Sequence, residues 1–116
     1  MSGFSFAKEA RLLDAGAFKR VFDGADSKAS HQYLLLLGCY NDLEHHRLGL
    51  VIAKKHVRLA VQRNRIKRVT RDFFRHCPCD SQGMDVVVLA RKGADQLDNA
   101  ALSSILRQQW KKLLPA

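Results

Sequence analysis

Three segments of the chain repeat apolar residues with the spacing of an amphipathic helix. In the first, Phe18, Val21 and Phe22 recur at i, i+3 and i+4, which predicts a helix over residues 15–23. Asp14 suits its N-cap, and Gly24 suits a left-handed residue that closes it. The last segment predicts a helix over 98–114 with one apolar stripe, made of Leu102, Ile105, Leu106, Trp110 and Leu113.

The central segment predicts a helix over residues 59–76. At about 100° per residue its apolar positions fall within about one quadrant. These positions are Leu59, Ile66, Val69, Phe73 and Cys77. The opposite side and its flanks carry Asn64, Arg65, Lys67, Arg68, Arg71 and Arg75. The helix is therefore expected to pack on a narrow stripe and to expose charge elsewhere.

Between these helices lie three apolar runs of strand length, at residues 31–40, 47–55 and 84–92. The first and third are apolar on both faces in the middle, which is typical of buried strands. Residues 26–30 are polar and are predicted to form a loop. Because only a short polar turn, residues 41–46, separates the first two runs, they are predicted to pair as an antiparallel hairpin.

The predicted element order is α-β-β-α-β-α, within a single domain that spans residues 1–116. This order indicates an α+β or α/β two-layer sandwich built on a small central sheet. The β-α-β passage over residues 51–88 is expected to form a parallel crossover, for which the general rule gives a right hand.

The positive charge of the chain is concentrated in one block. Residues 54–75 hold nine Lys or Arg and one acid, Asp72, so the block has a net charge of +8, against +9 for the whole chain. Guanidinium groups bind phosphate oxygens by paired, charge-assisted hydrogen bonds, so such a helix can follow a nucleic-acid backbone. With about six to eight phosphate contacts, affinity would fall with salt at a log–log slope on the order of −4 to −7. A merely solvated basic face is the competing interpretation.

Other chemistries find little support in the sequence. No apolar run approaches the ~18–20 residues of a spanning helix, and no secretory signal is recognised. Three cysteines, an odd number, favour a reducing compartment, so a cytoplasmic location is expected. His76, Cys77 and Cys79 lack the second ligand pair of a zinc site. No nucleophile–base set, glycine-rich phosphate loop or two-metal carboxylate cluster supports an autonomous nuclease.

The basic block also carries a family motif. The run AVQRNRIKRVTRDFFR at 60–75, preceded by KK at 54–55, resembles the RNR signature of the protein subunit of bacterial ribonuclease P. Residues 10–25 resemble the N-terminal helix of that family, with its paired Phe residues. RLGLVIAKK and MDVVVLARKGA resemble its strand before the signature and its late strand. From about Asn99 the match is only to a generic helix.

The resemblance implies a role in tRNA maturation. Members of the family partner a large catalytic RNA that removes the 5′ leader from precursor tRNA. Because that RNA carries the active site and binds Mg²⁺, no catalytic residue, metal site or cofactor is expected on this chain. The protein is expected to bind the RNA one to one, without a membrane, and to strengthen substrate and Mg²⁺ binding. The crossover of the family is left-handed, against the general rule.

The resemblance also assigns two sets of residues. The catalytic RNA would be contacted by Lys54, Lys55, Arg63, Asn64, Arg65, Lys67, Arg68 and Arg71. The single-stranded leader would lie in a cleft lined by Phe18, Phe22 and Tyr33 and flanked by Arg11. Two Phe residues four apart equally fit a helix that buries both, so this role competes with a purely structural one. The alternative function is that of a structural, ribosomal-type RNA-binding protein with no part in cleavage.

Overall fold

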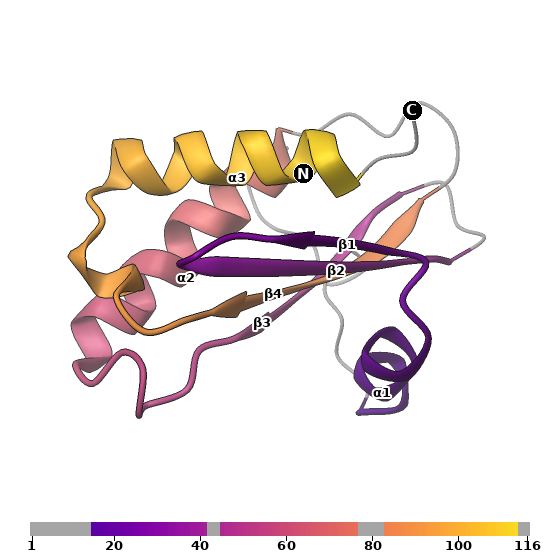
Figure 1. Cartoon of the computed structure of the whole chain (residues 1–116), viewed down its shortest axis with the longest axis horizontal. Coiled ribbons are helices and arrows are strands. Elements are labelled where there is room, and N and C mark those ends of the chain that lie inside the picture. Colours follow the sequence, from indigo (N-terminus) through magenta and orange to yellow (C-terminus); the bar gives the residue numbers. More distant parts are fainter. Residues whose placement is uncertain (1–14, 42–44, 77–82, 114–116) are drawn as a thin grey trace, which may run out of the picture.

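The computed structural model arranges helices around one small sheet (Figure 1). The structure describes residues 15–41, 45–76 and 83–113. Within them the elements are α1 (Ala15–Gly24), β1 (Ser27–Ser30), β2 (Leu34–Tyr40), β3 (Arg47–Val51), α2 (Ala60–Arg75), β4 (Met84–Ala90), the 3₁₀ turn η2 (Ala94–Gln96) and α3 (Asn99–Leu113). A small mixed sheet with helices packed on it confirms the predicted fold class.

The strands form a sheet in the order β1-β2-β4-β3. Strand β4 pairs antiparallel with β2 and parallel with β3, so the predicted parallel crossover is confirmed. Its left hand stays a prediction. The predicted hairpin of β2 and β3 is wrong, because β4 lies between them. The nearly continuous apolar sequence of β4 is buried at the centre of the sheet. The free energy gained from this burial outweighs the advantage of pairing β2 with β3, which lie close together in the chain.

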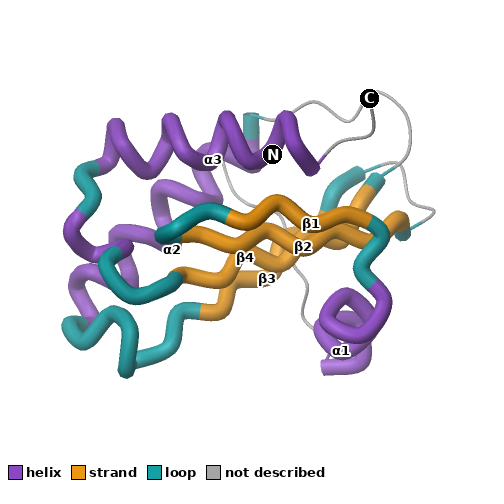
Figure 2. Tube along the Cα trace, viewed as in Figure 1, coloured by secondary structure: helices purple, strands orange, loops and turns teal. Residues whose placement is uncertain are grey.

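The two faces of the sheet are covered by different helices. Figure 2 shows α3 and α1 on opposite sides of the strands. Alternate strand residues accordingly enter two separate apolar clusters. The larger cluster joins the sheet to α2 and α3 and includes Leu34, Leu36, Val86, Val88, Ile66, Leu102, Leu106 and Trp110. The smaller cluster joins it to α1 and contains Val21, Leu37, Cys39 and Val87.

Strand β1 replaces the loop predicted at residues 26–30. It is an edge strand that pairs antiparallel with β2, Ser27 opposite Gly38 and Ser30 opposite Leu35. Its sequence has weak strand propensity, so backbone pairing with β2 and burial of Ala29 decide its conformation. The Asp26 carboxylate also accepts a 3.0 Å hydrogen bond from the backbone N–H of Tyr40.

Two expectations about where elements end are also corrected. Gly24 is the last residue of α1, and among the described residues Gly93, at φ +97°, is the glycine with positive φ. A Cβ at Gly93 would also stand 2.8 Å from Cε1 of Tyr33, so this position requires glycine. The strand predicted to reach residue 55 ends at Val51. Asp14, the expected N-cap of α1, lies outside the described residues.

Helix α2 packs on a wider stripe than its sequence predicts. Ile66, Thr70 and Phe74 are its buried residues, while Val69 and Phe73 are partly buried. Thr70 tolerates burial because its hydroxyl donates a 2.7 Å hydrogen bond to the carbonyl of Ile66. The expected burial of Leu59 is wrong, since it is 62% exposed. It is the N-cap residue, with extended backbone, so helical periodicity does not apply to it.

The predicted C-terminal helix is confirmed as α3. Its apolar stripe faces the larger cluster, with Leu102, Leu106, Trp110 and Leu113 buried. The Asp98 side chain accepts a 2.8 Å hydrogen bond from the backbone N–H of Ala101, which satisfies one donor of the first turn. The helix is therefore fixed at its start and along one side.

Candidate RNA-binding surfaces

Helix α2 carries most of the predicted RNA-contacting residues on one continuous element. Asn64 and Arg68 are exposed, and Lys67 and Arg71 are partly exposed at the sides of the helix. The only acid of α2, Asp72, pairs with Arg75 at 3.1 Å. The outward side of α2 therefore presents cationic and amide groups with almost no internal neutralisation.

Arg63 is also partly exposed, but its guanidinium is turned back on the protein. Nη1 donates hydrogen bonds to the carbonyls of Val57, at 3.0 Å, and Arg58, at 2.8 Å. These carbonyls belong to the turn between β3 and α2, on which Lys54 and Lys55 are exposed. Buried Val57 fixes the same turn, so Arg63 links α2 to the segment that presents the two lysines.

Arg65 makes a similar link on another side of α2. Its Nε donates to Gln62 Oε1 at 2.8 Å, and Nη1 donates to Asn99 Oδ1 at 2.9 Å. Nη2 reaches the carbonyl of Asp95 at 3.3 Å. Both arginines of the RNR run thus hold neighbouring segments, while Asn64 between them faces solvent. This role of Arg65 could not be predicted from the local sequence, because two of its partners lie 30 and 34 residues away.

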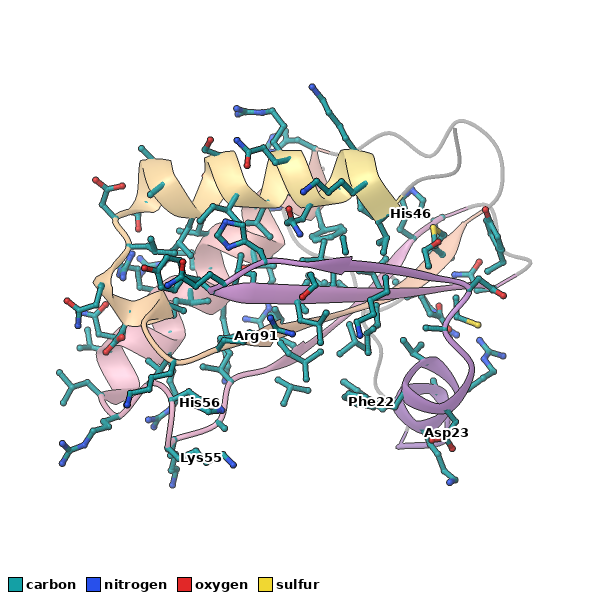
Figure 3. All side chains as sticks on the ribbon, in the orientation of Figure 1. Phe22, Asp23, His46, Lys55, His56 and Arg91 are labelled. Atoms are coloured by element: carbon teal, nitrogen blue, oxygen red, sulfur yellow. The ribbon has the colours of Figure 1, made fainter. Side chains whose placement is uncertain are left out.

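The second predicted set divides between the two faces of the sheet. Phe18 is partly buried against the smaller cluster, while Phe22, on the same helix, is 44% exposed. Leu35, Val51 and Leu89 extend this face beyond the fully buried residues and are only partly covered. In Figure 3, Phe22 points away from α1, toward the side on which the turn with Lys55 and His56 lies.

Tyr33 is not grouped with these residues. Its ring packs against the larger cluster and close to Gly93, so it belongs with the residues on the α2 and α3 side. Arg11, predicted to flank the leader cleft, lies outside the described residues. The structure therefore brings Phe18 and Phe22 to one sheet face and holds Tyr33 in a different environment.

A buried carboxylate holds α1 to the sheet. Asp85 of β4 is fully buried and accepts hydrogen bonds from Arg47 Nε at 2.7 Å and Nη2 at 2.6 Å. Asn41 Nδ2 donates to it at 2.9 Å, and Arg20 Nη2 from α1 donates at 2.7 Å. Sequence reasoning missed this cluster, although one acid inside the apolar strand MDVVVLA is the signal that could have found it.

The surroundings of Asp85 determine its charge. Burial by itself raises the pKa of this carboxyl group, but the hydrogen bonds from Arg47 and Asn41, the charge of Arg47 and the hydrogen bond from Arg20 outweigh it. The pKa of Asp85 therefore lies below its ordinary value, and the group is ionised at neutral pH. It joins α1 and the start of β3 to the central strand.

The described part of the chain offers neither a metal-binding cluster nor a membrane-spanning helix. Over the described ranges, no group of three or more His, Cys, Asp or Glu side chains is placed to hold a metal ion. Cys39 is free and buried, and burial raises the pKa of its thiol. Cys77 and Cys79 fall outside the described part of the chain. Of the helices that the structure describes, none has the length and apolar character needed to cross a bilayer.

Comparison with known proteins identifies the family. The Ribonuclease P family profile matches residues 6–114. The ribonuclease P protein component of Stutzerimonas stutzeri is 49% identical over 108 residues, covering 93% of this chain and 82% of the relative. That of Pseudomonas aeruginosa is 49% identical over 109 residues, covering 94% and 81%.

The solved structures agree with these matches. The RNase P protein of Staphylococcus aureus superposes with a TM-score of 0.81 at 26% identity, over 91% of this chain and 98% of that one. The Thermotoga maritima protein gives a TM-score of 0.73 at 25% identity, with the same coverage. The chain therefore belongs to the ribonuclease P protein family, the protein components of a tRNA-processing enzyme.

Proposed function

We propose that this protein binds the catalytic RNA of ribonuclease P through α2 and the turn that precedes it. The same protein holds the 5′ leader of precursor tRNA on the sheet face next to α1. The RNA partner carries the active site and binds Mg²⁺, and the protein strengthens the binding of substrate and metal. One protein acts with one RNA, in the cytoplasm.

The observation that carries the proposal is the uncompensated charge around α2. Arg68 and Asn64 are exposed on the helix, and Lys54 and Lys55 are exposed on the preceding turn. The sequence from 54 to 75 contains a single acid, Asp72, which pairs with Arg75, so no acid of this segment neutralises Lys54, Lys55 or Arg68. Phosphate oxygens of a folded RNA are the ligands that such a surface selects.

The leader role is supported by the partly covered sheet face. Leu35, Val51 and Leu89 are partly exposed apolar residues of this face, and Phe22 of α1 adds an exposed ring. Base–aromatic stacking accepts any base, since every base has a π face, and is worth roughly 1–3 kcal/mol per base. Such a surface suits a leader whose sequence differs among precursors.

Reconstitution tests the function directly. The protein is combined with the RNA subunit of a bacterial ribonuclease P, and precursor cleavage is measured at low Mg²⁺. Stimulation over the RNA alone is expected, and its absence would refute the proposal. Binding of the RNA without any stimulation would instead identify a structural RNA-binding protein.

The leader role is tested by Phe22→Ala in the reconstituted holoenzyme. The variant should bind precursor tRNA about 5- to 150-fold more weakly, the equivalent of one lost base stack, and bind mature tRNA as the wild type does. Lys19→Ala is a suitable control, because Lys19 is an exposed residue of the same helix that pairs with Asp23 at the surface. Equal losses for precursor and mature tRNA would contradict the leader role.

A further inference from the structure

A groove separates α2 from α3 on the side of the molecule away from α1. It has a volume of about 470 Å³ and is lined by Val69 and Phe73 of α2 and by Ser103, Arg107 and Trp110 of α3, among others. This volume lies within the ~300–1,000 Å³ typical of small-ligand sites. The groove is thus large enough to receive a single planar ring system.

The floor of the groove is apolar and held in place by aromatic contacts. Phe73 meets Phe74 edge to face, with ring centroids 5.3 Å apart, and Phe74 meets Trp110 in the same way at 5.1 Å. Because Phe74 and Trp110 are almost completely buried, this floor is part of the core. The surface is therefore preformed, and a flat ligand can bind to it without rearranging the core.

The rim of the groove is basic on both walls. An adjoining cavity of about 490 Å³ shares Val69, Asp72 and Asn99 with it and adds Arg65, Arg68 and Arg75 from α2. From the other wall, α3 contributes exposed Arg107, and the α3 sequence contains no acid between Asn99 and Leu113. Since the acid on the rim, Asp72, is paired with Arg75, the net field at the groove favours an anionic ligand.

We propose that this groove receives an unpaired nucleobase of the RNA that partners the protein, an inference that rests on the proposed function. The base lies against Val69 and Phe73, and the phosphates on its two sides are bound by Arg68 and Arg107. The Ser103 hydroxyl is placed to bond a base edge. Helix α3 thereby belongs to the RNA-binding surface, which the sequence confined to α2 and its preceding turn. A lipid chain or a peptide helix would use the apolar floor but not the arginines of both walls.

A pair of substitutions on α3 tests the groove. Ser103→Phe fills it with a ring, whereas Ser104→Phe puts the same ring at an exposed position outside it. Affinity for the RNA subunit of a bacterial ribonuclease P should fall on the order of tenfold for Ser103→Phe and stay within about twofold for Ser104→Phe. Thermal unfolding of the free variants shows whether each one folds.

Two further measurements test RNA binding in the groove even if Ser103→Phe does not fold. Arg107→Ala, at an exposed position, should reduce the salt dependence of RNA binding by about one unit of the log–log slope, and Gln108→Ala should leave it unchanged. Trp110 is the only tryptophan of the chain, so its fluorescence should change on addition of the RNA subunit and not on addition of anionic vesicles.

The outcomes separate this proposal from the proposed function. A wild-type protein that neither binds the RNA subunit nor stimulates cleavage refutes the proposed function and the groove together. A different result is a wild type that binds the RNA and stimulates cleavage while folded Ser103→Phe and Arg107→Ala variants bind the RNA equally well. That result refutes the role of the groove and leaves the proposed function intact. The ratio of precursor to mature tRNA affinity should stay unchanged in Ser103→Phe, because the leader is assigned to the other face of the sheet.

Discussion

Replacement of Asp85 by asparagine is predicted to destabilise this fold strongly. The carboxylate is fully buried and accepts hydrogen bonds from Arg47, Asn41 and Arg20. Asp85→Asn keeps the shape of the side chain but removes the negative charge. It also replaces one accepting oxygen with an NH₂ group that faces a guanidinium donor.

Most of the expected loss in the free energy of unfolding comes from Arg47, the partner that the substitution leaves in place. Arg47 is only 28% exposed, so in the variant its charge stays largely away from water after losing the buried carboxylate with which it pairs. Removal of one partner of such a pair costs about 3–5 kcal/mol. Arg20 is 53% exposed and can recover hydration, so its share is discounted to about 0–1 kcal/mol. The total is a large fraction of the ~5–15 kcal/mol that stabilises a typical domain.

Urea unfolding of wild type, Asp85→Asn and Arg20→Gln measures these contributions. Asp85→Asn should lose about 3–5 kcal/mol at pH 7, and Arg20→Gln no more than about 1 kcal/mol. Because the folded-state pKa of Asp85 is lowered, the contribution is complete above the unfolded-state value and is lost as pH falls below about 4. The free energies of unfolding of the wild type and Asp85→Asn should therefore become equal in acid. A loss below 1 kcal/mol at pH 7, or a difference that persists at low pH, would refute this reasoning.

The other predictions concern the arginines of α2 and the cap of α3. Arg63→Lys keeps the charge but loses the paired bonds to the turn, so amide exchange over 54–58 should accelerate in the free protein, whereas Arg68→Lys should leave it unchanged. Arg65→Ala should lose about 1 kcal/mol of stability in urea, and an equal loss in Arg68→Ala would contradict the bonding seen at Arg65. Asp98→Ala should cost about 0.5–2 kcal/mol in the same assay, and no change would show that the cap contributes nothing.

The sequence by itself determined the helices and the central strand. The apolar spacing along 15–23 and 98–114 places one face of each helix against a core, and the structure has α1 and α3 there. The apolar run at 84–90 is buried as expected. Such patterns are local, because burial of one face depends on the 3.6-residue or 2-residue repeat of the element itself. The concentration of charge near α2 is equally a property of the chain alone.

Only the tertiary structure decided which elements meet. It separated β2 from β3 by inserting β4, made a strand of residues 27–30, and divided the aromatic residues predicted for one cleft between two faces. It also turned Arg63 and Arg65 toward backbone carbonyls and side chains of other segments, and gathered three segments at Asp85. Each of these outcomes depends on partners distant in the chain. Their geometry exists only after the sheet has formed, and no local repeat of apolar and polar residues encodes it.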